Sequence, residues 1–568
     1  MDPAVWKDSI NYSAIVLAIG VISAYPLYRI WRTRQEDRLN FSIYTAMDDL
    51  DVLGRRSSPN RMMGTAVIVG GSITGLLAAR VCADHFERVV ILEADEGADT
   101  EFPAAAESKR DAHGNLNYVS RRARVAQTFE IHLYQPFALL ALRRLIPDFD
   151  ESFIDAGGRI EPWSFNAYWS GVKIGVPKSR YIKGRGLPKH HNIPKEDLPD
   201  TIWCTRANLE PFLRREIMDS YPGIEFMKAT VTSLTQGDSG AINGVVYTPK
   251  GQKSTKTMTP SFVVDCTGHS KAGVKWLEHL GIGPVPQVSY DPLQRYVTVW
   301  FKLDEEKFLN LPIPKEVRGL DCCFYAFEDS SLGGRLLWAS NGENGTFGLS
   351  FGGFGIPSEE LPKTPEELKD FYREFKTFSG KPMDDWYYDL VDYLSQDGGW
   401  ERAHYEECKI PPCVYVKYHE VASTLPRNFV ALGDAVMRLS PIYGLGVTKG
   451  VLGAVTLAGA LDKVHGRTIP ENFARDMMIS LDKRTGWSWD QAKISDYGYE
   501  TTIPCEGESL DEGAPMRAAI KEFLQLTTVD EEAKARFYYP RLWIYPNSTM
   551  LSERVFGMIA ARIAAKNK

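Results

Sequence analysis

The chain has 568 residues, of which 44% are hydrophobic and 24% charged, and its formal net charge is −7. This length exceeds what one simple hydrophobic core organises, so two or more domains are expected. The negative charge argues against a nucleic-acid partner, because such a partner needs a basic face. The eight cysteines lack a repeated Cys-x-x-Cys pattern, which indicates free thiols and no metal site.

Near the N-terminus, residues 10–28 carry no charge. A helix of this length just spans the hydrocarbon core of a bilayer, and no small-residue cleavage signal follows it. We therefore expect residues 1–34 to form a single-pass membrane anchor; a signal peptide or a core helix is the alternative. Arginines are denser after the segment than before it, which places the rest of the chain in the cytosol, at a membrane such as that of the endoplasmic reticulum. Residues 35–63 are polar and are expected to form a flexible linker.

Residues 65–95 have the pattern of a dinucleotide-binding unit: strand, Gly-rich turn, helix and strand. Gly70 and Gly75 bracket the turn, and a helix that opens near Ser72 would direct its free N–H groups at a phosphate. Glu93 ends the second strand, where a carboxylate can accept hydrogen bonds from both ribose hydroxyls of FAD or NAD. Because Ser72 stands where the motif has its middle glycine, an ordinary strand–turn–helix remains the alternative.

The middle of the chain predicts a second sheet. Residues 160–180 and 294–354 alternate polar with aromatic or β-branched residues, which is typical of strands. The Gly and Asn turns within the longer segment indicate a mostly antiparallel arrangement. Between the dinucleotide unit and these strands, three arginines could meet a pyrophosphate or a ribose, or could form a solvated basic loop: Arg121, Arg122 and Arg124.

Two further strand ends carry signals of the nucleotide-binding kind. A short buried strand at 262–264 runs into Asp265 and Gly268, and residues 429–461 predict a strand, an acid, a loop and a long helix rich in Ala and Gly. The acid is Asp434. Each segment alone could be an ordinary turn beside a packed helix.

The order and spacing of the three motifs resemble the flavoprotein monooxygenase superfamily that includes para-hydroxybenzoate hydroxylase and squalene epoxidase. The closest likeness is to members with a D-A-T-G-x-x-S strand end followed by a W-L-x-x-L-G helix. The corresponding segments here run from Asp265 to Ser270 and from Trp276 to Gly281. The likeness extends from about residue 64 to 465, so the anchor lies outside it.

This resemblance implies an α/β fold in which a Rossmann-like FAD-binding domain is interleaved with a mostly antiparallel β substrate domain. The N-terminal transmembrane helix and a helical C-terminus would be added to it. The expected FAD-binding domain comprises residues 64–160, 201–281 and 421–465. The expected substrate domain comprises residues 161–200 and 282–420, and residues 466–568 form the helical C-terminal region.

The resemblance also implies the positions of site residues. Gly433 and Asp434 would contact the ribityl and pyrophosphate part of FAD, and the loop after them would lie against the isoalloxazine ring. Leu445 stands where many relatives have a glutamine, which puts one hydrogen bond in doubt. The expected cofactor-binding residues are Gly70, Ser72, Gly75, Glu93, Arg122, Arg206, Asp265, Gly268, Gly433, Asp434, Pro441, Gly444, Leu445 and Gly446. The residues expected near the flavin face, as candidates for catalysis, are His132, Arg206 and Tyr443.

The expected function is that of an FAD-dependent monooxygenase. NADPH or NADH would reduce the flavin, and a flavin C4a-hydroperoxide would transfer one oxygen atom to the substrate by epoxidation or hydroxylation. Because an enzyme held at a bilayer meets molecules that partition there, we expect a lipophilic substrate of terpenoid, polyketide or alkaloid type, as in secondary metabolism.

Three alternatives remain open on the same fold. The first is a flavin dehydrogenase or oxidocyclase acting on a similar substrate. The second is a flavin halogenase, although the W-x-W-x-I-P element is missing, since Trp487-Ser-Trp489 continues as Asp-Gln-Ala. The third is a non-catalytic prenyl-binding protein; the retained Gly-Asp and Pro441–Gly446 elements argue against it, because a protein without flavin needs neither.

Overall fold

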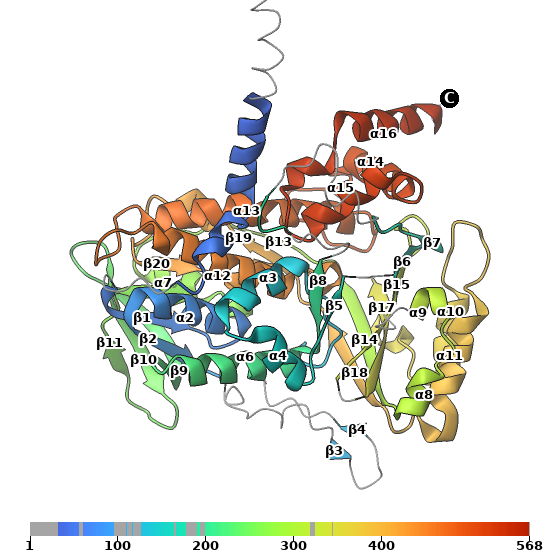
Figure 1. Cartoon of the computed structure of the whole chain (residues 1–568), viewed down its shortest axis with the longest axis horizontal. Helices are drawn as coiled ribbons and strands as arrows, with labels where there is room; N and C mark the ends of the chain where they lie inside the picture. Colours follow the sequence, from blue (N-terminus) through green and yellow to red (C-terminus); the bar gives the residue numbers. More distant parts are fainter. Residues whose placement is uncertain are drawn as a thin grey trace, which may run out of the picture.

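The computed structural model of the chain describes residues 32–55, 61–95, 109–110, 116–117, 127–163, 166–177, 190–193, 199–318, 324–343 and 345–566. The predicted membrane span at 10–28 and the predicted cofactor residue Arg122 lie outside these ranges. No helix within them combines the length and the apolar character that crossing a bilayer requires. The described residues form two large sheets and a group of C-terminal helices (Figure 1).

The first sheet is mixed and contains the dinucleotide-binding unit. Its strand order is β11-β10-β9-β2-β1-β12-β20, with parallel pairing from β9 to β20 and antiparallel pairing from β9 to β11. The strands are β1 (Met62–Val69), β2 (Phe86–Glu93), β9 (Ile224–Gln236), β10 (Ile242–Pro249), β11 (Lys256–Met258), β12 (Phe262–Asp265) and β20 (Phe429–Ala431). The β-branched runs of β1, β2 and β12 are buried, as expected for parallel strands covered on both faces.

The three strands that carry the predicted motifs are neighbours in this sheet. Val69 at the end of β1 pairs with Asp265 at the end of β12, which pairs in turn with Ala431 at the end of β20. Their carboxyl ends therefore meet at one edge of the sheet. Ligands of open α/β sheets bind at such an edge.

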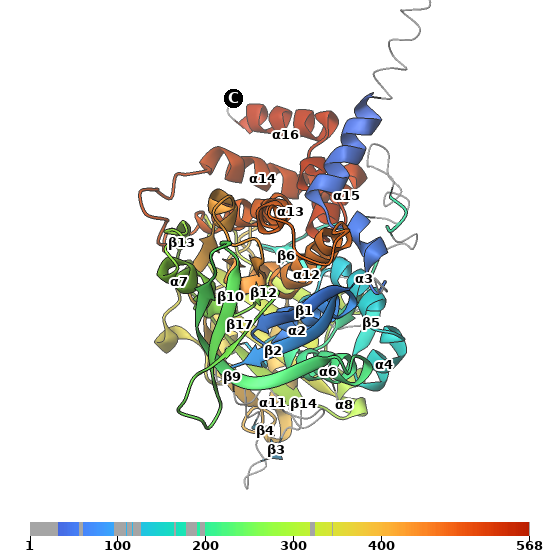
Figure 2. The ribbon, with the colours of Figure 1, turned by 90° about the vertical axis from the view of Figure 1, so that its left-hand side faces the viewer.

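Helices surround this sheet. After β1, α2 (Ile73–His85) packs against β1 and β2 and against α12 (Gly446–Asp462), which follows the third motif. The remaining helices of this part are α3 (Pro136–Leu145), α4 (Phe149–Asp155), α6 (Arg206–Ser220) and α7 (Ala272–His279). Figure 2 shows α2 and α12 beside the strands of the sheet.

The second sheet has the order β18-β14-β17-β16-β15-β6-β7 and is antiparallel except between β15 and β6. Its strands are β6 (Asn166–Trp169), β7 (Val172–Lys173), β14 (Gln294–Lys302), β15 (Phe324–Phe327), β16 (Arg335–Asn341), β17 (Thr346–Phe354) and β18 (His404–Lys409). The mostly antiparallel sheet predicted from the alternating residues is thus present. A separate hydrophobic core lies between this sheet and two helices, α10 (Pro365–Arg373) and α11 (Asp385–Ser395).

Smaller elements connect these parts. Antiparallel pairing joins β5 (Arg159–Pro162) to β8 (Asp200–Trp203), so the start of the 160–180 segment lies outside the second sheet. A third sheet consists of β13 (Gln287–Tyr290), β19 (Cys413–Val416) and β21 (Met437–Arg438). The others are β3 (Lys109–Arg110), β4 (Leu116–Asn117), α8 (Glu305–Leu309), α9 (Lys315–Arg318) and the 3-10 helices η3 (Gly268–Ser270), η4 (Ser358–Glu360), η5 (Gln396–Gly398), η6 (Tyr418–Val421) and η9 (Asn547–Met550).

The C-terminal region is helical, as its sequence predicts. It contains α13 (Phe473–Asp496), α14 (Ala514–Thr527), α15 (Glu531–Arg541) and α16 (Glu553–Lys566). The first of these helices packs along α12, and α16 packs on α14. The C-terminal helices therefore reach the element that follows the third motif.

The segment before β1 is packed against the C-terminal region. Residues 32–44 are helical, and the 3-10 helix η1 (Asp48–Val52) follows. Asp49 forms an ion pair with Arg484 of α13 at 2.5 Å, and both side chains are buried. The expectation of a flexible linker over 35–63 is therefore wrong for its described part. Its polar residues lie on the exposed first turns of the helix, whereas the apolar residues after them are buried.

Candidate functional site

The Gly-rich turn after β1 is held by close backbone contacts. Gly70 has φ +106°, and a Cβ atom added to it would lie 2.3 Å from the carbonyl oxygen of Cys266. A Cβ atom on Gly75 would lie 1.8 Å from the carbonyl oxygen of Gly70. Only glycine fits both positions, because each neighbour is a backbone atom. The two glycines bring the ends of β1 and β12 together at the start of α2.

Ser72, at the place of the middle glycine, turns its side chain towards α6. Its Oγ atom donates a hydrogen bond of 2.8 Å to Glu210 and accepts one of 2.6 Å from Arg206. Arg206 also pairs with Glu210 at 3.2 Å, and about a fifth of the Arg206 side chain is exposed. The structure thus places Arg206, predicted both for cofactor binding and for catalysis, at the dinucleotide turn.

Glu93 connects the end of β2 to the same turn. Its carboxylate accepts hydrogen bonds of 2.7 Å from the backbone N–H groups of Gly71 and Asp95. The side chain is buried. An ionised carboxylate has about four acceptor sites, so these two bonds are compatible with additional bonds to ribose hydroxyls.

Asp265, at the second strand end, holds the backbone that follows β12. Its two oxygens accept hydrogen bonds of 2.9 Å from the backbone N–H groups of Thr267 and Gly273. The carboxyl is fully buried, and this burial raises its pKa. It therefore organises the start of α7. Gly268 has φ +64°, and no heavy atom in the part of the chain that the structure describes lies within 4 Å of an added Cβ atom, so here the backbone faces open space.

At the third strand end, Gly433 lies against the helix α2 that follows the first strand end. This residue has φ +63°, and a Cβ atom on it would lie 2.7 Å from Oγ1 of Thr74 in α2. The next residue, Asp434 in the 3-10 helix η7 (Gly433–Ala435), forms an ion pair of 3.0 Å with Lys449 of α12. Lys449 is buried, whereas 44% of the Asp434 side chain is exposed. The Asp434 carboxylate is thus oriented by a lysine and remains accessible.

The turn before α12 contains the 3-10 helix η8 (Pro441–Tyr443) and packs against an extended segment of the chain. A Cβ atom on Gly444 would lie 3.0 Å from Cβ of Leu133. In the same segment, the N–H of Gln135 donates a hydrogen bond of 3.1 Å to Thr448 of α12. Among the described residues, none has a heavy atom within 4 Å of a Cβ atom added to Gly446, the first residue of α12. The start of α12 therefore also faces open space.

His132 lies in this extended segment. Its Nδ1 atom is 2.8 Å from the carbonyl oxygen of Glu130. Burial, and next the charge of Arg206, lower the pKa of His132 to about 4, so the imidazole is neutral at pH 7. Arg206 is therefore close enough for its charge to act on His132. Leu133, the residue after His132, lies against Gly444.

Tyr443, the third catalytic candidate, is hydrogen-bonded to the C-terminal region. Its hydroxyl donates to Asp496, the last residue of α13, and Tyr290 donates to the second oxygen of this carboxylate at 2.9 Å. Burial raises the pKa of Asp496 to about 7, although the two hydrogen bonds oppose this shift. The hydroxyl of Tyr443 is thus engaged with a buried acid.

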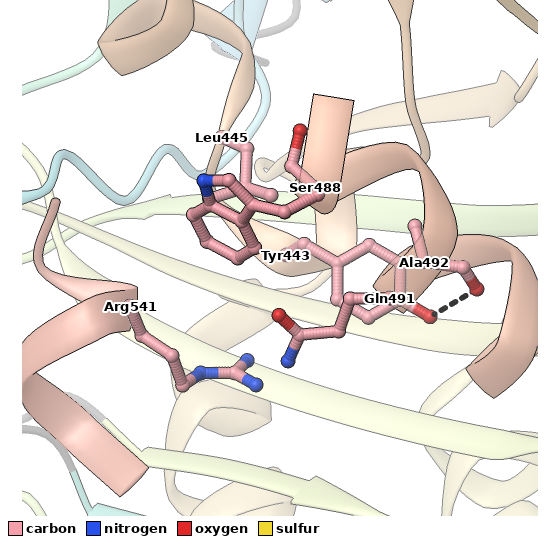
Figure 3. Close-up of a pocket in the computed structure, with 7 residues that line it drawn as sticks. Tyr443, Leu445, Ser488, Gln491, Ala492 and Arg541 are labelled. Carbon is pink, nitrogen blue, oxygen red and sulfur yellow. Dashed lines mark hydrogen bonds between the residues drawn. The ribbon is translucent and has the colours of Figure 1, made fainter. Parts of the chain in front are cut away.

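A small pocket adjoins the start of α12, between the turn at η8, helix α13 and the end of α15 (Figure 3). Its lining residues are Tyr443, Leu445, Trp487, Ser488, Gln491, Ala492 and Arg541. Most of this lining is apolar. Leu445, which stands where relatives have a glutamine, contributes to it.

The residues at this edge fit an FAD molecule. Gly268 and Gly446 leave open space beside two of the three strand ends. The polar groups of Arg206 and Asp434 are partly exposed there. The N-termini of α2 and α12 add the partial positive charge that attracts phosphate and other anions.

No family model matches the chain. Protein Rv3254 of Mycobacterium tuberculosis (strain ATCC 25618 / H37Rv) is 24% identical over 443 residues, which cover 76% of this chain and 80% of that protein.

Two solved structures share the fold. A flavoprotein/dehydrogenase from Cytophaga hutchinsonii superposes with a TM-score of 0.52 at 11% identity, covering 88% of this chain and 100% of the other. The p-nitrophenol 4-monooxygenase PnpA from Pseudomonas putida DLL-E4 gives a TM-score of 0.50 at 14% identity, with 85% and 98% covered. The chain therefore shares the mixed α/β fold of these two proteins, which confirms this part of the predicted fold.

Several site residues were not predicted from the sequence. Lys449 is the one basic residue of the largely apolar helix α12. A lysine in such surroundings indicates that an acidic residue lies nearby, because a buried charge needs a partner. Glu210 follows Arg206 by one helical turn, which also indicates a pair. Asp496 and Arg541 stand among ordinary helical residues, and no local pattern marks them.

Proposed function

We propose that the protein is an FAD-dependent monooxygenase that inserts one oxygen atom, by epoxidation or hydroxylation, into a lipophilic small molecule, with NADPH or NADH as the electron donor. The observation that carries this proposal is the meeting of three motif-bearing strand ends, where Gly268 and Gly446 face open space. The bound flavin supplies the oxidation chemistry that amino-acid side chains lack.

The chain offers a group for each part of FAD. The N-terminus of α2 and the guanidinium of Arg206 would hold the pyrophosphate, because both carry positive charge. Glu93 would accept hydrogen bonds from the adenosine ribose. Asp434, oriented by Lys449, would accept them from the ribityl chain, and the backbone at Gly446 would lie against the ring.

The pocket beside α12 would hold the substrate. Leu445, Trp487 and Ala492 present apolar surface to it, which favours a lipophilic molecule and excludes water from the reaction. The hydroxyl of Tyr443 is held by Asp496, so its ring is fixed at the wall of the pocket. His132 is neutral and could hold or pass a proton at its Nε2 atom.

We also place the protein at a membrane, with residues 10–28 as a single-pass anchor and the catalytic part in the cytosol, for example at the endoplasmic reticulum. Two exposed apolar side chains support this: Leu39 is 60% exposed and Phe556 of α16 is 61% exposed. Both helices extend from the same side of the molecule in Figures 1 and 2. A chain lacking residues 1–31 should leave the membrane fraction of a cell lysate; its retention there would contradict the anchor.

The decisive experiment is reconstitution of the full-length protein. We expect a yellow protein with about one FAD per chain, whose flavin is reduced by NADPH or NADH under anaerobic conditions. Admitting oxygen together with a panel of terpenoid, polyketide and alkaloid compounds should then yield a product with one added oxygen atom, detected by mass spectrometry. A folded but colourless protein that does not bind added FAD would overturn the proposal.

A flavin dehydrogenase or oxidocyclase is the second candidate, because the structural neighbour from Cytophaga hutchinsonii is named a flavoprotein/dehydrogenase. The same experiment separates the two. A dehydrogenase product loses two hydrogen atoms and gains no oxygen, and the reaction reduces the flavin without a nicotinamide.

A further inference from the structure

Arg541 presents a positive charge to the pocket beside α12. It is the last residue of α15, and its guanidinium extends towards Gln491 and the ring of Tyr443 (Figure 3). The surfaces around it are apolar, with Leu445 and Trp487 among them. A cation in such surroundings loses much of its hydration and needs an acceptor in exchange.

Within the described part of the chain, Arg541 forms no hydrogen bond or ion pair, and its guanidinium lies 4.9 Å from the ring centre of Phe537. Other arginines of this region are paired. Arg536 of the same helix binds Glu532 at 2.8 Å, and Arg562 of α16 binds Glu522 at 2.9 Å. With respect to the described residues, Arg541 therefore differs from these two arginines in having no carboxylate partner.

The acid that holds the hydroxyl of Tyr443 is not a partner of Arg541. Asp496 accepts hydrogen bonds from the hydroxyls of both Tyr443 and Tyr290. Burial lowers the pKa of the Arg541 guanidinium, and the groups that oppose this shift are tyrosines, which are neutral near pH 7. The positive charge thus remains available to a ligand.

We infer that Arg541 binds an acidic group of the substrate, and that the substrate is a lipophilic carboxylic acid. A guanidinium can bind a carboxylate through two parallel hydrogen bonds, and the Gln491 amide can donate a third. The apolar body of the acid would lie on Trp487 and Leu445, next to the start of α12. This inference rests on the proposed function for the identity of the pocket as the substrate site, and it narrows the substrate class.

The test compares acids with their neutral esters. The probes are decanoate and 1-naphthoate, each with its methyl ester, and their binding to FAD-loaded full-length protein is measured by calorimetry. We expect the acids to bind about tenfold more tightly than the esters, because only the acids form a hydrogen-bonded ion pair with the guanidinium; this ratio corresponds to about 1.4 kcal/mol. Arg541→Gln should remove this preference without changing ester binding, and Arg541→Lys should retain part of it.

Arg475→Gln is the matched control, because it removes the same charge from α13 at a side chain that is 43% exposed and outside the pocket. It should leave the preference unchanged, and thermal unfolding verifies that each variant is folded. The inference is overturned if the wild type shows no preference for acids, if Arg541→Gln keeps the preference, or if acid and ester lose affinity equally. Binding needs no turnover, so a failure of the monooxygenase proposal shows separately, as missing flavin or missing oxygen transfer.

Discussion

The hydroxyl of Tyr443 donates a hydrogen bond to Asp496, which connects the turn before α12 to the end of α13. Tyr290 of β13 donates to the same carboxylate. Asp496 lies beyond residue 465, where the likeness to flavoprotein monooxygenases fades. The C-terminal helices are therefore part of the candidate site, because they hold its third motif in place and complete its pocket.

Substituting Tyr443→Phe tests this connection. The change leaves one oxygen of the buried Asp496 without its donor, and we expect the free energy of unfolding to fall by about 1–3 kcal/mol, measured by urea denaturation. Tyr393→Phe is the control, because the Tyr393 hydroxyl donates to a backbone carbonyl at 3.1 Å in the second sheet's helical layer. A loss for Tyr443→Phe that does not exceed that of the control would contradict the connection.

The raised pKa of Glu130 predicts that the free energy of unfolding depends on pH. Burial raises the pKa of this carboxyl from 4.5 to about 8, against a hydrogen bond from Thr298. Between these two values the unfolded chain releases a proton that the folded protein retains, so stability falls as pH rises through this window and is fully present below it.

Glu130→Gln should remove the part of the pH dependence that comes from this carboxyl. Urea unfolding at pH 5.5 and pH 8 is expected to show a smaller loss of stability with pH in the variant than in the wild type. Glu401→Gln, at an exposed position, should retain the dependence of the wild type. Equal losses in the wild type and in Glu130→Gln would contradict the assignment of a buried, protonated Glu130.

Most of the fold could be predicted because its signals are local. Buried parallel strands need continuous β-branched runs, and the turns at Gly70 and Gly433 need glycines, so both leave a pattern within a few residues. The helix at 32–44 was missed because its sequence carries no such local signal. Its exposed first turns are polar, and the partner that orders the following segment, Arg484, is more than 400 residues away.

The site could be predicted only in part. The cofactor motifs are local, but the side chains that orient them come from distant elements. Ser72 and Glu210 are 138 residues apart, and Tyr443 and Asp496 are 53 apart. Such pairs depend on how the helices pack against one another, and the hydrophobic periodicity of the sequence does not predict this packing. Asp265 is another example, since only the fold shows that its two oxygens accept hydrogen bonds from the backbone N–H groups of Thr267 and Gly273.

The exposed carboxylate of Asp434 should be required for cofactor retention. Asp434→Ala removes an acceptor for FAD and leaves the buried Lys449 without its acid. We expect the affinity for FAD to fall about tenfold or more, measured as the flavin-to-protein ratio after dialysis. Asp476→Ala, which removes a largely exposed acid of α13, should keep its flavin. Normal flavin content in Asp434→Ala would contradict the placement of the cofactor.

Glycine substitutions test where the flavin ring lies. An alanine at Gly446 meets no heavy atom of the described residues within 4 Å and suits the first turn of a helix, so the flavin-free protein should be as stable as the wild type. If the ring lies against this backbone, however, the new methyl group occupies its place. We expect Gly446→Ala to fold normally and to lose FAD affinity about tenfold or more, measured by fluorescence titration of the flavin-free protein.

Two other glycines complete this test. Gly557→Ala, in α16, also meets no heavy atom within 4 Å and should bind FAD like the wild type. In Gly75→Ala the methyl group would meet the Gly70 carbonyl oxygen at 1.8 Å, so overpacking should lower stability by about 1–3 kcal/mol even without flavin. If Gly446→Ala binds FAD as tightly as Gly557→Ala does, the ring lies elsewhere. If it unfolds like Gly75→Ala, Gly446 is needed for the fold. Only a stable protein with weakened FAD binding places the flavin at the start of α12.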